Sequence, residues 1–335
     1  MKHLSLLAIT TLACAGSVFA QGKKILVTGM PSEAVAEFQA VAPGATVKAV
    51  DSAQLKNEIA DADALLGTIN ADLVRAGKKL KWVQMYFAGM ENVLSPELVN
   101  SDIVLTNGKI IQGPEIADHA MALLLALTRG LYRTIPARTS EQWKRGTEQG
   151  MVELNGKTAV VIGVGGIGTQ IAVRANGFGM RVIGVDPKDK PYMPFVQKMV
   201  TPERLDEVLP EADVIFISAP HTPKSRGMVG SRQFDLMKKG SYFVAVSRGK
   251  IFDNNALVRA LDSKRLAGAG LDVTDPEPLP PGHPLWKFEN VVITPHTAGT
   301  SDRIQERRVA LVKENVRRFV AGEPLLNVVD KQAGY

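Results

Sequence analysis

The chain has 335 residues, which is enough for about two domains of ordinary size. Hydrophobic residues make up 45% of it and charged residues 22%, a globular composition that excludes a disordered or fibrous protein. The formal net charge is +6, but the 40 basic residues are scattered along the chain. We therefore expect a solvated basic surface that suits a small anionic substrate, and no nucleic-acid partner.

The first twenty residues have the pattern of a secretory signal peptide. Lys2 and His3 precede an apolar stretch over residues 4–16, and small residues at Val18 and Ala20 occupy the positions that signal peptidase reads. The stretch is too short for a membrane span, which needs about 20 apolar residues, so we expect no stable membrane anchor. This pattern predicts a periplasmic or secreted protein. A translation start near Val18 would instead give a cytoplasmic one, and that alternative stays open.

Cysteine and histidine usage limits the chemistry that the chain can perform. The only cysteine, Cys14, lies in the predicted signal peptide, so the segment from Gln21 onward has no thiol for a disulfide or a nucleophile. The five histidines are scattered and form no cluster at metal-ligand spacing. We therefore expect no metal site.

From Lys23 onward, short β-rich runs alternate with helical stretches, which predicts parallel sheets with crossover helices. In the first part we expect a helix over residues 31–41 and strands over residues 24–27, 46–50, 64–66, 82–86 and 103–106. In the second part we expect six strands, over residues 159–162, 181–185, 214–218, 242–246, 268–273 and 291–294. The predicted fold class is α/β, with two doubly wound Rossmann-like domains and a cleft between them.

Three segments connect or flank these predicted domains. A helix over residues 114–131 is apolar on nearly all sides, which favours burial between the two domains. The polar segment of residues 133–150, which contains Trp143, is interpreted as an arm that packs on a partner subunit in a homodimer. After a last helix over residues 302–320, the tail is expected to return to the first domain.

A glycine-rich turn carries the clearest functional signal. The run Gly163-Val164-Gly165-Gly166-Ile167-Gly168 has the spacing G-x-G-x-x-G, follows a predicted strand and opens a predicted helix. Glycines there let the backbone approach a pyrophosphate, whose charge is met by free N–H groups at the helix N-terminus. Asp186 ends the next strand and is placed to bind the adenosine ribose, which favours NAD over NADP, although Lys188 and Lys190 lie close by.

Three later segments, together with the glycine-rich turn, resemble one known family. They are Ser247-Arg248-Gly249, the run from Leu271 to Pro280 that contains Asp272 and Glu277, and Thr294-Pro295-His296-Thr297-Ala298-Gly299. With the earlier run from Leu80 to Gly89, they are similar to the D-isomer-specific 2-hydroxyacid dehydrogenases. This group contains glyoxylate and hydroxypyruvate reductases and phosphoglycerate dehydrogenase. The resemblance covers nearly all of residues 23–330.

The resemblance implies a catalytic set of Arg248, Glu277 and His296. The arginine would hold the substrate's carboxylate and keto oxygen with a planar, always-charged fork. The histidine would give a proton to the carbonyl oxygen as hydride arrives from the nicotinamide, and the glutamate would orient the imidazole and favour its charged form. Taken singly, each could be an ordinary surface or loop residue.

The same resemblance implies where the ligands bind. Backbone groups of Ala88, Gly89 and Met90 would anchor the substrate carboxylate from the opposite domain, and Asp272 would touch the nicotinamide amide. Further cofactor contacts are implied at Ala219, Pro220, Ser247, His296 and Gly299. The remaining histidines, His119, His221 and His283, are interpreted as structural or cofactor-adjacent.

These features predict an NAD-dependent oxidoreductase that interconverts a small 2-keto acid and a D-2-hydroxy acid. Residues 21–115 plus 300–335 are assigned to a flavodoxin-like substrate domain, and residues 116–299 to an NAD-binding domain. Bulky groups in the segment of residues 85–91 favour small acids such as glyoxylate or hydroxypyruvate. The alternative is a catalytically weak, NAD-sensing binding module of the corepressor type.

Overall fold

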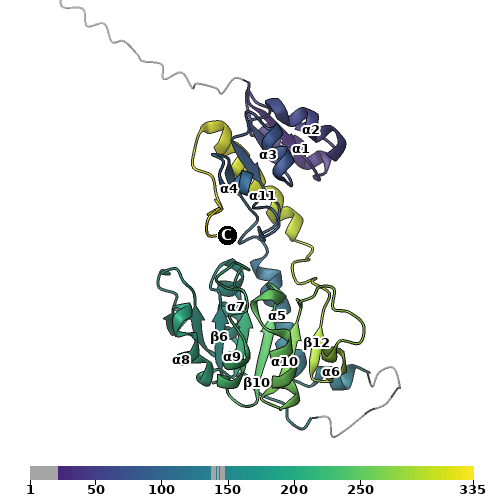
Figure 1. Ribbon diagram of the computed structural model, residues 1–335, viewed down its shortest axis with the longest axis vertical. Coiled ribbons are helices and arrows are strands. Elements are labelled where there is room, and N and C mark those ends of the chain that lie inside the picture. Colours follow the sequence, from purple (N-terminus) through teal and green to yellow (C-terminus); the bar gives the residue numbers. More distant parts are fainter. Residues whose placement is uncertain (1–21, 137–140, 142, 144–147) are drawn as a thin grey trace, which may run out of the picture.

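The computed structural model describes residues 22–136, 141, 143 and 148–335, which form two α/β units stacked along the long axis of the molecule (Figure 1). The predicted signal peptide lies outside the described residues, and so does part of the predicted arm over residues 133–150. No helix in the described part of the chain is long and apolar enough to cross a membrane.

The first unit is built on a five-stranded parallel sheet in the order β2-β1-β3-β4-β5. This order is that of flavodoxin-like folds. The strands are β1 (Lys24–Val27), β2 (Thr46–Ala49), β3 (Ala64–Leu66), β4 (Trp82–Gln84) and β5 (Val104–Thr106). The helices are α1 (Ser32–Ala40), α2 (Ser52–Glu58), α3 (Ala71–Ala76) and α4 (Pro96–Val99), with the 3-10 turn η1 (Ile59–Asp61).

Side-chain caps explain where three of these helices begin. The side chains of Asp51, Asn70 and Ser95 each accept a hydrogen bond from a backbone N–H in the first turn of α2, α3 and α4. Such caps satisfy donors that have no partner inside the helix. The short helices therefore start at defined residues, and the loops that follow the strands are held in place.

The second unit contains a seven-stranded parallel sheet in the order β12-β11-β10-β9-β6-β7-β8. The strands are β6 (Thr158–Ile162), β7 (Arg181–Val185), β8 (Lys198–Val200), β9 (Val214–Ile217), β10 (Ser241–Ala245), β11 (Leu266–Leu271) and β12 (Val291–Ile293). Central strands β6, β9 and β10 are buried at every residue because helices cover both faces. The prediction of two doubly wound parallel domains is confirmed.

The seventh strand, β8, was not predicted. It has only three residues and pairs with β7 alone, at the edge of the sheet. An edge strand buries less apolar surface than a central one, so its sequence carries a weak signal.

The helices of the second unit cover both faces of this sheet. They are α5 (Gly113–Thr128), α6 (Leu131–Thr134), α7 (Gly166–Gly177), α8 (Leu205–Val208), α9 (Ser231–Leu236) and α10 (Asn254–Asp262), with the 3-10 turns η3 (Pro202–Arg204), η4 (Leu209–Glu211), η5 (Gly249–Ile251) and η6 (Pro284–Lys287). Helix α5 packs on α7 and on β10, β11 and β12, in one apolar cluster with them. The apolar helix is therefore buried against the second sheet, and not between the two domains as predicted.

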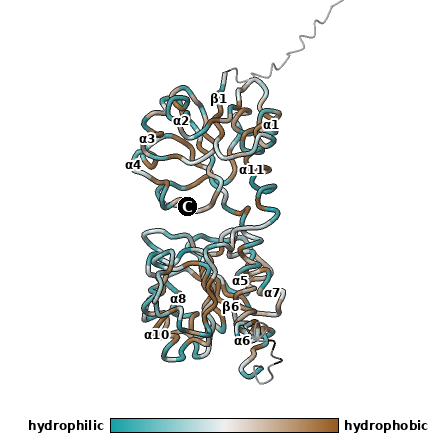
Figure 2. The backbone as a smooth tube through the Cα atoms, turned by 90° about the vertical axis from the view of Figure 1, so that its right-hand side faces the viewer, coloured by the Kyte–Doolittle hydropathy of each residue, from teal (hydrophilic) through white to brown (hydrophobic). Residues whose placement is uncertain are grey.

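The chain returns to the first unit through α11 (Ile304–Ala321). Val312 and Val316 of this helix are buried beside Trp82 in the core of the first sheet. The tail then pairs with β5, since Val329 N donates to the Leu105 carbonyl at 2.8 Å. The predicted return of the tail is confirmed, and the end of the chain lies between the two units in both views (Figures 1 and 2).

Candidate active site

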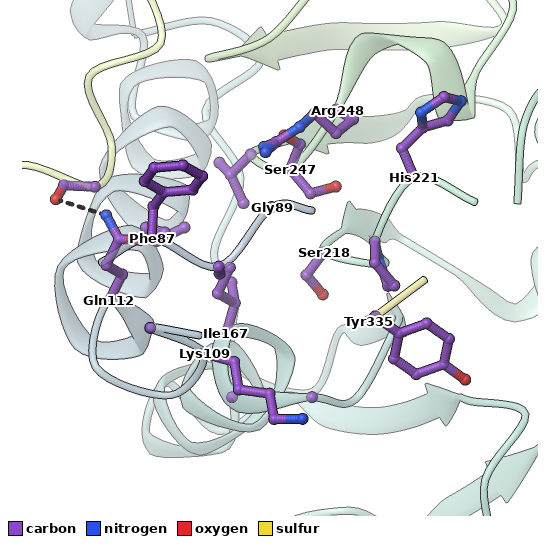
Figure 3. Close-up of a pocket in the computed structure, with 18 of the residues that line it drawn as sticks. Phe87, Gly89, Lys109, Gln112, Ile167, Ser218, His221, Ser247, Arg248 and Tyr335 are labelled. Atoms are coloured by element: carbon purple, nitrogen blue, oxygen red, sulfur yellow. Dashed lines mark hydrogen bonds between the residues drawn. The ribbon is translucent and has the colours of Figure 1, made fainter. Parts of the chain in front are cut away.

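A cavity of about 380 Å³ lies between the two units (Figure 3). Loops that follow the carboxyl ends of parallel strands line it, which is where open α/β sheets bind ligands. These loops supply Phe87 to Glu91 after β4, Asn107 to Ile110 after β5, Gly165 to Ile167 after β6, Ser218 to His221 after β9, Val246 to Arg248 after β10, Asp272 after β11, and His296, Ala298 and Gly299 after β12.

The cavity brings together most of the residues selected from the sequence. Those that line it are Ala88, Gly89, Met90, Gly165, Gly166, Ile167, Ala219, Pro220, Ser247, Arg248, Asp272, His296 and Gly299. Gly163, Gly168, Asp186 and Glu277 are not among the lining residues. Asp186 is hydrogen-bonded to the glycine-rich turn, and Glu277 contacts His296.

Two glycines of the turn allow close contacts between backbone segments. Gly163 has a φ of +91°, and a Cβ there would lie 2.4 Å from the backbone of Ala219. A Cβ at Gly168 would lie 1.9 Å from the Gly163 carbonyl oxygen. Only glycine permits these approaches, so the two residues hold the turn against its neighbours.

The open side of the same turn faces the cavity. Gly165 precedes α7 without a side-chain cap, and a Cβ there would meet nothing within 4 Å. The first N–H groups of a helix have no partner inside it, and the helix dipole adds positive potential at that end. The uncapped turn therefore fits the pyrophosphate of a dinucleotide.

Asp186 is buried behind this turn and is hydrogen-bonded to it. Its Oδ2 accepts from Val164 N at 2.9 Å, and its Oδ1 accepts from Lys188 N at 2.9 Å. Lys190 Nζ lies 3.2 Å from the same Oδ1. The carboxylate thus fixes the turn, and the ammonium of Lys190 partly compensates its negative charge.

His296 reaches the cavity from the loop after β12. Its Nδ1 lies 2.5 Å from Glu277 Oε1, and both side chains are about two-fifths exposed. The backbone of His296 has a φ of +53°, a left-handed conformation that is uncommon outside glycine. The loop therefore presents the imidazole in a defined direction, with a carboxylate on its far nitrogen.

The buried residue Asp272 stabilises this loop through hydrogen bonds. Its side chain is 1% exposed, and Oδ1 accepts from Thr294 Oγ1 at 2.6 Å and from Thr297 N at 3.0 Å. Oδ2 accepts from Ala298 N at 3.0 Å, and the Asp272 carbonyl accepts from His296 N at 3.0 Å. These bonds show that Asp272 positions the loop of residues 294–298, called the histidine loop below.

His119 belongs to the same buried network. Its Nε2 lies 2.8 Å from Thr294 Oγ1, and Thr294 in turn donates to Asp272. The imidazole therefore supports the histidine loop from α5, as the structural interpretation of this residue predicts.

Arg248 follows β10 and extends toward the first unit. Its Nη1 donates to the Ser247 carbonyl at 2.7 Å, and its Nε forms an ion pair with Glu91 of the opposite unit. Burial opposes ionisation of Glu91, but the hydrogen bond and charge of Arg248 hold the pKa of this carboxyl below its usual range. A Cβ at Gly89 would lie 2.0 Å from Arg248 Nη2, so a larger residue there would displace the guanidinium from this position.

Several lining residues were not selected from the sequence. They include Phe87, Glu91, Lys109, Gly334 and Tyr335. His221, interpreted from the sequence as structural or cofactor-adjacent, also lines the cavity. Glu91 directly follows the predicted Ala88–Met90 anchor, and that position was the available signal for it. Lys109 follows the predicted strand over residues 103–106, which was the available signal for it. Tyr335 had none, because only the folded chain brings the tail beside the cavity.

Only part of the segment of residues 85–91, with its bulky side chains, faces the cavity. Met85 is fully buried in the core of the first unit, and the Tyr86 hydroxyl donates to the Thr28 and Leu66 carbonyls at 3.0 and 2.8 Å. Of the bulky groups from which a small substrate was inferred, Met85 and Tyr86 therefore do not line the cavity. Phe87 is the large aromatic side chain of this segment that lines the cavity.

Together these groups define a class of protein. A dinucleotide-binding turn, an imidazole paired with a carboxylate and an arginine fork meet at one interdomain cavity, which is the arrangement of an oxidoreductase for small anions. No group of three or more His, Cys, Asp or Glu side chains in the described ranges is placed to hold a metal ion.

Comparisons with known proteins narrow this class to one family. Residues 121–298 match the family described as "D-isomer specific 2-hydroxyacid dehydrogenase, NAD binding domain". A glyoxylate reductase of Korarchaeum cryptofilum is 34% identical over 282 residues, which are 82% of this chain and 84% of that protein. The chain belongs to the D-2-hydroxyacid dehydrogenase family and is an NAD(P)-dependent enzyme of that family.

Other relatives extend the similarity over most of the chain. A D-3-phosphoglycerate dehydrogenase of Methanocaldococcus jannaschii is 31% identical over 92% of this chain, which spans 59% of that longer protein. A solved glyoxylate reductase of Paecilomyes thermophila is 28% identical, with a TM-score of 0.79 over 93% of this chain and 99% of that one. An NADPH-dependent glyoxylate/hydroxypyruvate reductase of Sinorhizobium meliloti, solved with NADP and sulfate, is 27% identical, with a TM-score of 0.78 over 93% and 100% of the two chains.

Proposed function

We propose that the protein reduces small 2-keto acids of the glyoxylate and hydroxypyruvate type to the corresponding D-2-hydroxy acids. The observation that carries this proposal is the meeting of the His296–Glu277 pair and Arg248 at the cavity that the glycine-rich turn also lines. Similarity to proteins named glyoxylate reductase supports the substrate class. In this proposal residues 21–115 plus 300–335 form the substrate domain and residues 116–299 form the NAD-binding domain.

Arg248 binds the substrate in this mechanism. Its guanidinium holds the carboxylate and keto oxygen of the acid, because the planar fork matches both acceptors. Backbone N–H groups of Ala88, Gly89 and Met90 meet the same carboxylate from the other unit, so closure around the substrate would complete the site and exclude water. Arg248 must release Glu91, at least in part, when the substrate arrives.

His296 moves the proton. The protonated imidazole donates from Nε2 to the keto oxygen, and in the oxidative direction the neutral imidazole takes the proton back. Glu277 is paired with Nδ1, which fixes the orientation of the ring and leaves Nε2 for the substrate. A reduced dinucleotide held at the glycine-rich turn (Gly165, Gly166, Ile167) would be the source of the hydride for the keto carbon.

We further propose that NAD(H) is preferred to NADP(H). The Asp186 carboxylate behind the ribose position supports this preference, and the ammonium of Lys190 limits its strength. Four of the similar solved structures contain NADP or NADPH, so both forms of the cofactor need to be tested. The ratio of kcat/KM for NADH and NADPH measures the preference, and a ratio below one would refute it.

The experiment that tests the proposed function is oxidation of NADH by the purified residues 21–335 with glyoxylate, hydroxypyruvate, pyruvate and longer 2-keto acids. We expect turnover that is fastest with glyoxylate and hydroxypyruvate and is lost in His296→Ala. NADH binding without turnover on any acid would support the alternative, an NAD-sensing binding module. In that case the paired imidazole and carboxylate would need another explanation.

We also propose that residues 1–20 direct export by a Sec-type signal peptide. Cleavage before Gln21 is the testable consequence, and cell fractionation with N-terminal sequencing of the product measures it. An intact N-terminus in the cytoplasmic fraction would refute export.

A homodimer is proposed on the basis of exposed apolar side chains near the arm. Leu131 and Ile135 are 42% and 63% exposed, and Trp143 is 91% exposed. Exposed apolar groups of this size are typical of an interface. A single species with the mass of one chain in light scattering would refute the dimer.

A further inference from the structure

The last residues of the chain form a fixed turn at the cavity. Asp330 Oδ1 accepts hydrogen bonds from Gln332 N and Ala333 N at 3.0 and 2.9 Å, and Gly334 N donates to the Asp330 carbonyl at 2.8 Å. Asp330 N donates to the Tyr335 carbonyl oxygen at 3.1 Å, which closes the turn. The tail is thus folded back on itself and does not extend freely.

This turn is attached to the first unit. Lys331 Nζ donates to the carbonyls of Leu98, Ser101 and Ile103 at 3.0, 2.5 and 3.0 Å. The adjacent Asn327 Nδ2 donates to the Lys109 carbonyl at 2.7 Å. The first unit therefore determines where Tyr335 lies.

Tyr335 nevertheless contacts the second unit. Its ring is half-buried and lies under the ammonium of Lys188, which is 4.2 Å from the ring centroid. Gly334 lies near Thr222, in the loop after β9. Figure 3 shows the ring at the cavity margin near Ser218 and Lys109. The tail of one unit thus covers the nucleotide-binding edge of the other.

The position along the cavity identifies the part of the cofactor that this ring would meet. Lys188 is two residues beyond Asp186, and its backbone N–H is hydrogen-bonded to that carboxylate. The acid that ends this strand marks the adenosine ribose in doubly wound folds. The nicotinamide end is marked by His296, which lies on the other side of the glycine-rich turn, after β12.

We propose that Tyr335 forms one wall of the adenosine subsite, where its ring stacks on the adenine nucleoside of the cofactor. An aromatic face is a suitable surface for a purine because stacking needs only two flat π systems. The adenosine half is then bound by both units, with the glycine-rich turn and Asp186 on one side and the tail on the other. The inference rests on the proposed use of a dinucleotide.

Two nearby ammonium groups suit the phosphates of the same ligand. Burial, and then the charge of Lys188, lowers the pKa of Lys109, whose Nζ donates to the Val328 carbonyl at 2.8 Å. An anion bound between two ammonium groups offsets the repulsion between their charges. The nucleotide that Tyr335 covers would supply that anion.

The test compares NADH with reduced nicotinamide mononucleotide, which lacks the adenosine half. In Tyr335→Ala we expect the KM for NADH to rise about tenfold, or about 1.4 kcal/mol, while the KM for the mononucleotide is unchanged. Tyr335→Phe keeps the ring and should bind NADH as the parent does. Phe178→Ala is the matched control, because it removes an exposed aromatic at the far end of α7.

Calorimetric titration with AMP and with nicotinamide mononucleotide measures the same subsite without turnover. Tyr335→Ala should weaken AMP binding by a similar factor and leave the mononucleotide unaffected. Unchanged AMP binding would overturn the proposal, and tighter AMP binding would show that the ring occupies the subsite. Equal losses for both fragments would assign the tail a merely structural role. If the parent binds AMP but reduces no 2-keto acid, the proposed function fails while this inference stands.

Discussion

His296 and Arg248 reach the same cavity, but the structure holds them in different ways. His296 is fixed through its own loop, because Asp272 accepts hydrogen bonds from three backbone N–H groups and one hydroxyl around it. Arg248 is held by the carbonyl of Ser247 and by the carboxylate of Glu91 in the opposite unit. The imidazole is therefore positioned before any ligand binds, whereas the guanidinium depends on the spacing of the two units.

This difference indicates how the two side chains divide the work. A preorganised proton donor contributes to the chemical step, since no reorganisation is needed at the moment of reaction. A guanidinium that exchanges an internal carboxylate for the substrate's carboxylate contributes to binding. Changes at the histidine loop should therefore lower kcat, and changes at Arg248 and its partner should alter KM.

The largest effect is expected for His296→Ala. Removal of the proton donor should lower kcat by about a thousandfold, within the range of general acid catalysis, with little change in the KM for hydroxypyruvate. Steady-state kinetics measures both values, and an unchanged circular-dichroism spectrum and urea midpoint show that the fold is intact. A variant with parental kcat would refute the role of the imidazole.

Arg248→Ala should act mainly on substrate binding. Loss of charge-assisted hydrogen bonds of about 1.5–3 kcal/mol should raise the KM for hydroxypyruvate about 10–100-fold. Arg248→Lys should recover only part of this, because an ammonium cannot form the planar fork. A lower kcat with an unchanged KM in Arg248→Ala would contradict the assignment of Arg248 to substrate binding.

Asp272→Ala tests how the histidine loop is held. The substitution leaves buried N–H groups without acceptors, which costs about 1–3 kcal/mol of the free energy of unfolding, and lets the imidazole move. Urea denaturation measures the first effect and kcat the second. Asp275→Ala, on the neighbouring exposed loop, is the control. Parental stability and kcat in Asp272→Ala would show that the loop does not depend on this carboxylate.

The smallest effect is expected for Glu91→Gln. Without the internal carboxylate, Arg248 is free for the substrate, so the KM for glyoxylate should fall by a few-fold, about 0.5–1 kcal/mol. Glu97→Gln removes another carboxylate of the same unit, paired with Arg75 outside the cavity, and should leave KM unchanged. A rise in KM for Glu91→Gln would mean that Glu91 positions Arg248 and does not compete with the substrate.

Much of this site could be predicted because its residues follow strands in recognisable local patterns. The glycine-rich turn, Asp186 and the segments around Arg248 and His296 each follow a short β-rich run, and parallel strands bring their carboxyl ends to one edge. Such features can be predicted from the local sequence alone.

The remaining features depend on contacts between distant parts of the chain. Glu91 and Arg248 are 157 positions apart, and their pairing follows from how the two units face each other. Tyr335 reaches the cavity only because the tail is attached beside β5. Helix α5 was placed incorrectly because an apolar surface indicates burial but does not identify the partner.

The most direct test of the central claim is chiral analysis of the glycerate formed from hydroxypyruvate and NAD(P)H by residues 21–335. The account predicts the D isomer, formed by the parent and not by His296→Ala. Formation of the L isomer, or D-glycerate produced equally by His296→Ala, would contradict the proposed arrangement of Arg248, His296 and the cofactor.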